Sequence, residues 1–119
     1  VSRRELLKTA NISEEVLVEL ESYGLVRTRP GTQHFDADAV IIAQTAGELA
    51  AFGIEPRHLR AFRTAADREI GLVEQVVNPI RRSREEGAEG RAAQAVADIA
   101  ALSVRLHAGL VRAALRNLR

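Results

Sequence analysis

The order of turn and helix-end signals between residues 21 and 56 constrains the fold of this chain more than any other feature. Gly24 follows an apolar helical pattern and suits the positive φ at which many helices end. Pro30-Gly31 then separates two short runs typical of β-strands, and Asp36 is placed to cap another helix. This order predicts a mainly α chain in which a small two-stranded hairpin joins a pair of short helices to longer ones.

Capping residues and apolar spacing predict the other elements. Ser2 and Glu5 have the spacing of a capping box, and Ser13 is a second N-cap. Pro56 favours the start of a long helix, and Pro79 is expected to break or kink it. With their caps, the expected helices are residues 2–11, 13–24, 36–53, 56–78 and 91–118. About two more helical turns are expected after Pro79, up to residue 86. Residues 87–90 are then a flexible connection to the last helix.

The predicted hairpin is a small wing. Its strands are Leu25-Val26-Arg27 and Gln33-His34-Phe35, and its turn is Arg29-Pro30-Gly31-Thr32. Its candidate functional residues are Arg29, Gln33 and His34.

Length and composition indicate one compact domain. The 119 residues suffice to bury roughly two thirds of the surface that the unfolded chain exposes. Within it we expect a first module at residues 1–55 and a helical extension at residues 56–119. Methionine is absent even at position 1, so we also expect that an amino-terminal partner domain lies outside this chain.

Composition also bears on location and chemistry. No cysteine is present, which excludes disulfides and thiolate metal sites. No signal-peptide pattern and no apolar run of about 18 residues is evident, so we expect a cytoplasmic protein without membrane contact. The sequence has no nucleophile motif, no Gly-rich phosphate loop and no metal-ligand spacing. We therefore expect that the chain is not an enzyme and binds no metal or other cofactor. The aromatic residues are assigned to the core: Tyr23, Phe35, Phe52 and Phe62.

Charge is unevenly distributed along the chain. Residues 1–55 contain five Lys or Arg and nine Asp or Glu, a balance of −4, whereas residues 56–119 contain twelve and seven, a balance of +5. Phosphate neutralisation supplies most non-specific DNA affinity. The acidic first half therefore argues against a DNA-docking surface there.

One set of residues in the first half has a family-specific spacing: Ile12-Ser13, Leu17, Glu21, Gly24-Leu25, Gly31, Phe35, Asp38 and Gly53-Ile54. This set resembles the winged helix-turn-helix of MerR-family transcription regulators. Residues 53–60 are similar to the second, carboxy-terminal module of the actinobacterial FtsR group, which is linked to cell-division genes. The resemblance implies a winged helix-turn-helix followed by helices that form a dimer and sense a ligand or partner.

The departures from the family pattern bear on function. Val18, Glu19 and Leu20 stand where the family has DNA-contacting Arg and Tyr, and Gln33 replaces the arginine of the wing. We therefore expect a carboxy-terminal regulatory domain that serves homodimerisation and effector or partner binding, with DNA bound by an amino-terminal domain outside this chain. The alternative is a second winged-helix module that contacts promoter DNA.

Two surfaces are candidates for partner binding. The first is a basic cluster suited to anionic ligands, whose alternative is a solvated helix face with local ion pairs. The second is an apolar stripe on the last helix that predicts a homodimer interface, whose alternative is packing within one chain. The basic cluster is Arg57, His58, Arg60, Arg63 and Arg68, and the stripe is Val96, Ile99, Leu102, Leu106 and Leu110, with Val104, Val111 and Leu115 lying off it.

Overall fold

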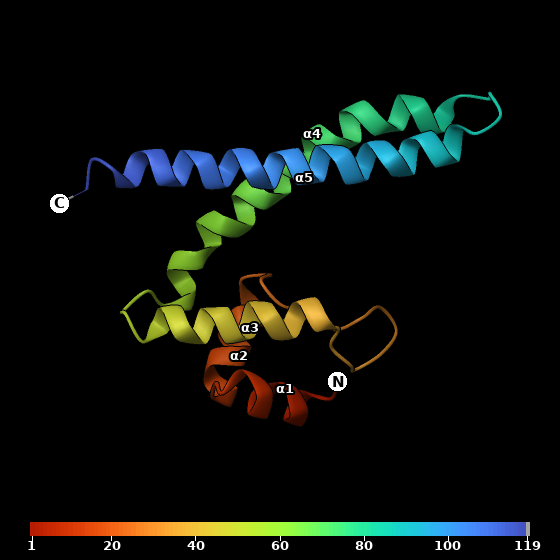
Figure 1. Cartoon of the computed structure of the whole chain (residues 1–119). Helices are drawn as coiled ribbons and strands as arrows, with labels where there is room; N and C mark the ends of the chain where they lie inside the picture. Colours follow the sequence, from red (N-terminus) through yellow and green to blue (C-terminus); the bar gives the residue numbers. More distant parts are fainter. Residues whose placement is uncertain (119) are drawn as a thin grey trace. The chain divides into compact units, whose positions relative to one another are not determined.

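The computed structural model describes residues 1–118, and all of its regular elements are helical, which confirms the mainly α prediction. The elements are α1 (Arg3–Ala10), α2 (Glu14–Ser22), α3 (Ala37–Ala50), the 3-10 helix η1 (Pro56–Leu59), α4 (Arg60–Arg82) and α5 (Ala88–Leu115) (Figure 1). The chain packs as two compact units, Val1–Ala65 and Ala66–Arg119, and the division falls within α4.

Side-chain caps set the starts of the first three helices, as predicted. Ser2 Oγ accepts from the Glu5 amide at 3.2 Å, and Glu5 Oε1 accepts from the Ser2 amide at 3.2 Å. Ser13 and Asp36 each accept from the amide three residues further on, at 3.2 and 2.9 Å. Each bond satisfies a backbone group that has no partner within its own helix.

The core of the first unit lies between α1, α2 and α3. Its largest buried side chains are Leu6, Leu17, Leu20 and Phe35, each at most 1% exposed. Small residues of α3 complete this core and let α1 pack closely along α3. The other buried members are Ala10, Val26, Ala39, Ala43, Ala46 and Leu59.

The predicted two-stranded wing is wrong, because residues 1–118 contain no strand. The amides of Leu25 and Val26 both donate to the carbonyl of Leu20, at 2.9 and 3.4 Å, so this segment finishes α2 instead of forming a ladder. The backbone of Phe35 forms hydrogen bonds with Val1. The Phe35 amide donates to the Val1 carbonyl at 2.7 Å, and the Val1 nitrogen donates to the Phe35 carbonyl at 2.6 Å. Both expected strands thus have other hydrogen-bond partners.

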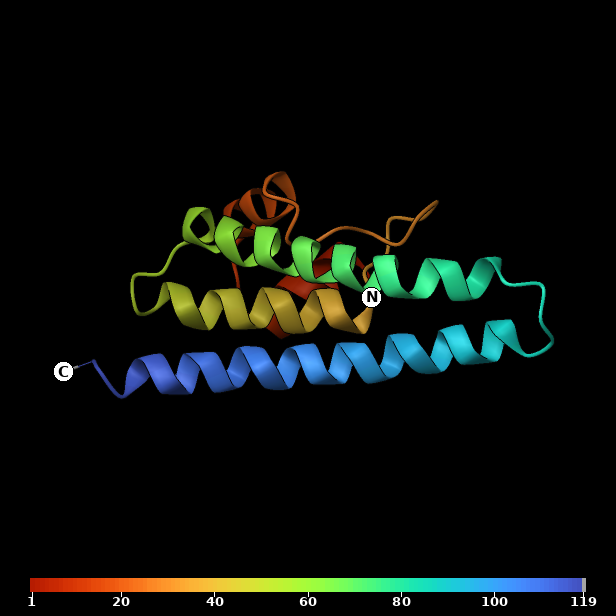
Figure 2. The same cartoon turned by 90° about the horizontal axis from the view of Figure 1, so that it is seen from above.

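The second unit is an antiparallel hairpin of α4 and α5 (Figure 2). Val73 and Val77 of α4 pack against Ala92 of α5, with Ile80, Ala95, Val96 and Ile99 around them. Pro79 does not break α4, which continues to Arg82; the proline lies in the last turn of the helix and removes only the hydrogen bond that its own amide would have made to the preceding turn. The connection lies earlier in the chain than predicted, at residues 83–87 and not 87–90, because α4 ends at Arg82 and α5 begins at Ala88, after Gly87 with φ 83°.

Only Phe35 of the four aromatic residues belongs to the buried core, contrary to prediction, and Tyr23 is half-buried outside it. Phe35 is 1% exposed, but Phe52 and Phe62 are 86% and 59% exposed. Phe52 follows the end of α3 at Ala50, so it is not held on the buried side of that helix. Leu59 is buried with the first unit's core, which explains why η1 belongs to that unit. The functional boundary at residues 55/56 stays a prediction.

Candidate functional site

Glutamates line the exposed side of α2, the helix that corresponds to the DNA-reading helix in the MerR resemblance. Arg3 of α1 lies between two of them: its Nη2 is 2.6 Å from Glu14 Oε1, and its Nη1 is 2.7 Å from Glu21 Oε1. Hydrogen bonds to Glu14 and then to Glu21 raise the pKa of Arg3. Glu15 and Glu19 remain exposed. A positive charge beside α2 is thus already matched, and the helix presents a negative surface that repels phosphate.

Several residues of the predicted basic cluster have partners within the first unit. Arg57 Nη1 lies 3.0 Å from Glu55 Oε2, and His58 Nδ1 accepts from the Glu55 amide at 2.9 Å. The guanidinium carbon of Arg60 lies 5.1 Å from the centroid of the Tyr23 ring. These contacts agree with a solvated helix face that makes local pairs.

The remaining cluster residues, Arg63 and Arg68, belong to different units of the chain. Arg63 lines a shallow depression of about 240 Å³ in the first unit, together with Arg27, Asp36 and Asp38. Two carboxylates in its lining make it a poor site for an anion. Arg68 belongs to the second unit. A ligand site made of all five residues stays a prediction.

The three predicted wing residues lie in an exposed loop. The Arg29 amide donates to the His34 carbonyl at 2.8 Å, and the Thr32 amide donates to the Arg29 carbonyl at 3.0 Å. The Thr32 hydroxyl accepts from the His34 amide at 3.2 Å. The side chains of Arg29, Gln33 and His34 are exposed, and hydrogen bonds among backbone groups and the Thr32 hydroxyl hold the loop.

The apolar stripe of α5 is divided into a covered and an uncovered part. Val96 and Ile99 pack against α4 within the chain. Leu102, Leu106 and Leu110 follow at helical spacing on the same side, but they are 55%, 64% and 61% exposed. We name residues 102–116 the α5 tail. Packing within the chain therefore accounts for the first two residues of the predicted interface and leaves the other three without cover in the second unit.

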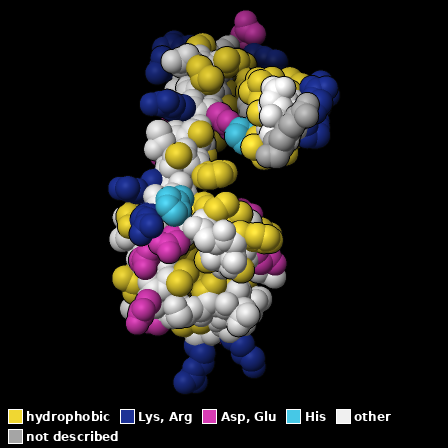
Figure 3. Space-filling view, turned by 90° about the vertical axis from the view of Figure 1, so that its left-hand side faces the viewer, with side chains coloured by type: hydrophobic (Ala, Val, Ile, Leu, Met, Phe, Trp, Pro, Cys, Tyr) yellow, Lys and Arg dark blue, Asp and Glu magenta, His cyan; other side chains and the backbone are white. Residues whose placement is uncertain are grey.

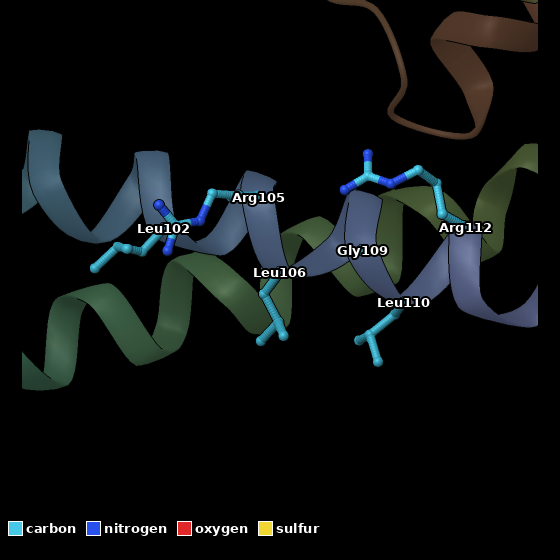
Figure 4. Close-up of a pocket in the computed structure, with 6 residues that line it drawn as sticks. All are labelled: Leu102, Arg105, Leu106, Gly109, Leu110 and Arg112. Atoms are coloured by element: carbon cyan, nitrogen blue, oxygen red, sulfur yellow. The ribbon is translucent and has the colours of Figure 1, made fainter.

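The α5 tail carries an open depression of about 600 Å³ (Figure 4). Leu106 and Leu110 project from one side of the helix, whereas Arg112 leaves it on the other. All the lining residues come from α5, so the depression has no opposing wall of its own. A surface of this kind suits a partner helix better than an enclosed small molecule. The lining residues are Leu102, Arg105, Leu106, Gly109, Leu110 and Arg112.

A second group of apolar residues lies elsewhere around the tail. Val104, Val111 and Leu115 are 69%, 44% and 54% exposed. Figure 3 shows hydrophobic side chains reaching the surface next to Lys and Arg side chains. Scattered exposed apolar residues are ordinary, but two groups on one helix make this tail a candidate interaction surface. One neighbouring helix can cover only one of them.

By length and composition alone, α5 could cross a membrane, contrary to the expectation from the sequence. It contains an 18-residue stretch of mean hydropathy 1.2 with at most two charged residues. Any such stretch includes both Asp98 and Arg105, and each costs about 2.5–3.5 kcal/mol at the centre of a bilayer. Helices in soluble proteins pass the same test, so this is weak evidence for a membrane span.

Comparison with known proteins decides the family. The sequence profile described as "Rv1828-like, C-terminal domain" matches residues 1–119. The chain belongs to the Rv1828-like C-terminal domain family. It is 42% identical over 117 residues to a protein of Mycobacterium tuberculosis named "Uncharacterized HTH-type transcriptional regulator Rv1828" and to one of Mycobacterium bovis named "Uncharacterized HTH-type transcriptional regulator Mb1859". The match covers 98% of this chain and 47% of each relative, so the chain spans about half the length of the curated relatives it matches.

Three residues of this Rv1828-like domain are important to its surfaces but were not predicted from the sequence. Arg3 neutralises part of α2 from another helix, and nothing in its sequence neighbourhood indicates that contact. Arg105 and Arg112 flank the tail depression, and their spacing of seven residues does indicate a shared helix face. Charged neighbours of an apolar stripe are therefore the signal that would have found them.

Proposed function

We propose that this chain is the carboxy-terminal regulatory domain of a MerR-family transcription regulator, that it self-associates through the α5 tail, and that another part of the protein binds the operator. The observation that carries the proposal is the set of uncovered leucines, Leu102, Leu106 and Leu110, in a depression without an opposing wall. The names of the relatives support the regulatory setting, and a cytoplasmic location is part of the proposal.

The acidic face of α2 supports the view that this domain does not read DNA. Glu15 and Glu19 are exposed, while Arg3 is held by Glu14 and Glu21. A DNA-reading helix needs positive charge toward phosphate and donors toward base edges. The α2 surface supplies neither.

Self-association gives such a domain a regulatory mechanism. A dimer places two operator-binding parts on one complex, which raises their effective concentration on paired half-sites. A small-molecule or protein effector that prefers the dimer over the monomer would increase DNA occupancy by linkage.

Light scattering of the purified chain at tens of micromolar tests self-association. We expect a dimer for the natural sequence and a monomer for Leu106→Asp, since a charge in a buried apolar interface is costly. The matched control is Ile41→Asp on α3, because Ile41 is 60% exposed and Leu106 is 64% exposed. The control should remain dimeric, and circular dichroism should show unchanged helix content in both variants. A monomeric natural chain at this concentration would overturn the proposal.

A gel-shift titration against promoter DNA tests the second half of the proposal. We expect only weak binding that salt abolishes. Tight binding by this chain alone, with a steep dependence on salt, would instead support a second DNA-contacting module.

A further inference from the structure

We infer that a hollow at the carboxyl ends of α1 and α3 is a binding site for a small organic cation with N–H donors, an alkylammonium or alkylguanidinium group. The hollow has a volume of about 330 Å³, and its polar lining residues are Thr9, Asn11, Gln44 and Glu48. We name it the α1–α3 hollow. It lies within the first unit, so the inference goes beyond the proposed function and requires neither self-association nor DNA.

Two helix ends place backbone acceptors beside the hollow. α1 ends at Ala10 and α3 ends at Ala50, and the residues that follow them, Asn11 and Ala51, both line the hollow. The first two amides after α1 both donate to the carbonyl of Leu7, so neither reaches the last carbonyls of that helix. The last carbonyls of a helix have no partner within it and carry a partial negative charge. Both helices therefore make the potential in the hollow negative.

The close packing of α1 on α3 fixes the walls of the hollow. A Cβ on Gly47, which lines the hollow, would lie 2.7 Å from Ile12 Cγ2 and 3.7 Å from the Ala10 carbonyl oxygen. Ala43 and Ala46 of α3 are buried in the same core as Ala10. A site whose walls are already in place loses less conformational freedom when a ligand binds.

The negative charge of the hollow has no partner within the chain. Glu48 is the one charged residue in the lining, it is exposed, and it forms no ion pair with any of residues 1–118. The last turn of α3 contains no basic residue, and Lys8 in the last turn of α1 does not line the hollow. A carboxylate near the carbonyl end of a helix is unfavourable, so a bound cation would relieve this repulsion.

The other polar side chains of the hollow determine the class of cation. Thr9, Asn11 and Gln44 each have a side-chain oxygen, and in the described part of the chain none of these side chains has a hydrogen-bond partner. An ammonium group has three N–H donors and a guanidinium group has five, so either can bind the Glu48 carboxylate and these oxygens together. The volume is near the lower end of the roughly 300–1,000 Å³ of ligand sites, which suits a small ligand.

NMR titrations of the amide signals of the whole chain test the site. The probes are n-propylguanidinium and n-butylammonium, and tetramethylammonium is the matched control because it has the same charge and no N–H donor. We expect saturable shifts at residues 9–11 and 47–51, with a dissociation constant of about 1 mM for at least one probe, as suits a ligand of so few atoms. Tetramethylammonium should bind roughly tenfold more weakly. Equal binding of tetramethylammonium, or shifts that rise linearly with any added salt, would overturn the inference.

Three variants make the test specific to the hollow. Glu48→Gln keeps the shape of the side chain, removes its charge and should weaken binding of the probe roughly tenfold. Asn11→Gly removes one side-chain oxygen but tolerates the φ of 55°, and it should weaken binding about threefold. Glu15→Gln at the exposed start of α2 is the matched control and should bind the probe like the natural chain. Unchanged binding by Glu48→Gln would contradict the site.

A blocked tripeptide that carries the better of the two groups, Gly-Arg-Gly or Gly-Lys-Gly, distinguishes the sources of the cation. Tighter binding of the tripeptide than of the simple probe assigns the hollow to a side chain of a partner protein, and weaker binding assigns it to a free metabolite with the same group. Light scattering of Glu48→Gln should give the same oligomeric state as the natural chain. Failure of the probes to bind would thus overturn this inference and leave the proposed function unchanged.

Discussion

The guanidinium carbon of Arg60 lies 5.1 Å from the centroid of the Tyr23 ring, which holds the start of α4 to the end of α2. A cation over an aromatic face at an exposed site stabilises by about 0.5–1 kcal/mol. We expect Arg60→Gln to lower the free energy of unfolding by this amount, while Tyr23→Phe, which keeps the aromatic face, changes it little. Urea denaturation measures both. If Arg60→Gln lowers the free energy of unfolding by the same amount in a Tyr23→Leu background as in the natural chain, the contact between Arg60 and Tyr23 contributes nothing to stability.

Gly47 permits the close approach of α3 to the turn between α1 and α2. A Cβ built on Gly47 would lie 2.7 Å from Ile12 Cγ2, a branched methyl that cannot move without rotating the side chain at its base. We expect Gly47→Ala to lower the free energy of unfolding by about 1–3 kcal/mol through overpacking. Gly71→Ala is the matched helical control, because nothing lies within 4 Å of its Cβ, and it should be neutral or stabilising.

A second variant makes the Gly47 prediction specific. Ile12→Ala removes the methyl that the new Cβ would meet. Gly47→Ala should therefore cost less in the Ile12→Ala background than in the natural chain. Equal costs in the two backgrounds would show that the close contact is not the cause.

The capping box at the start of α1 predicts a pH dependence. Hydrogen bonds from the Ser2 amide and then the Ser2 hydroxyl lower the pKa of Glu5. The ionised carboxylate is therefore favoured in the folded state, so its contribution is present above the ordinary glutamate pKa and is lost as the pH falls through the lowered pKa. We expect the Tm difference between the natural chain and Glu5→Gln to shrink as the solution is acidified.

Two other variants check the capping assignment. Ser2→Ala should destabilise by about 1 kcal/mol at neutral pH, because it removes the cap itself. Ser2→Asp, which keeps an N-cap acceptor, should restore most of that loss. A Tm difference for Glu5→Gln that stays constant with pH would contradict the proposed role of the carboxylate.

The acidic face of α2 predicts how DNA affinity responds to charge. Glu15→Arg/Glu19→Arg changes the local charge by four units on an exposed surface. We expect measurable non-specific DNA binding in fluorescence anisotropy at low salt, with a steeper salt dependence than the natural chain. The same double change at Glu86 and Glu89 in the second unit is the control. Equal gains in both variants would mean that α2 has no special relation to DNA.

Features that depend on a few neighbouring residues were determined by the sequence. The caps at Ser2, Ser13 and Asp36 lie where their spacing places them, because each needs only a backbone amide three residues away. The mainly α class follows from apolar periodicity in the same way. The basic and acidic halves are likewise properties of composition.

The absence of the wing hairpin could not be predicted from residues 25–35 alone. The two expected arms contain the strand-forming residues Val26 and Phe35, but strand propensity does not name a partner. Phe35 pairs with Val1, which lies 34 positions away in the sequence, and the amides of the first arm turn back to Leu20. Which backbone group comes within reach is settled only when the helices have packed.

The same limit applies to the candidate interface. Val96 and Leu106 belong to one apolar stripe and are equivalent by spacing, yet Val96 packs on α4 and Leu106 is 64% exposed. The sequence by itself determined that α5 has an apolar side, because side-chain direction in a helix repeats every few residues. Only the tertiary structure decided how far α4 covers that side, since burial depends on where a second helix lies and not on the order of residues within the first.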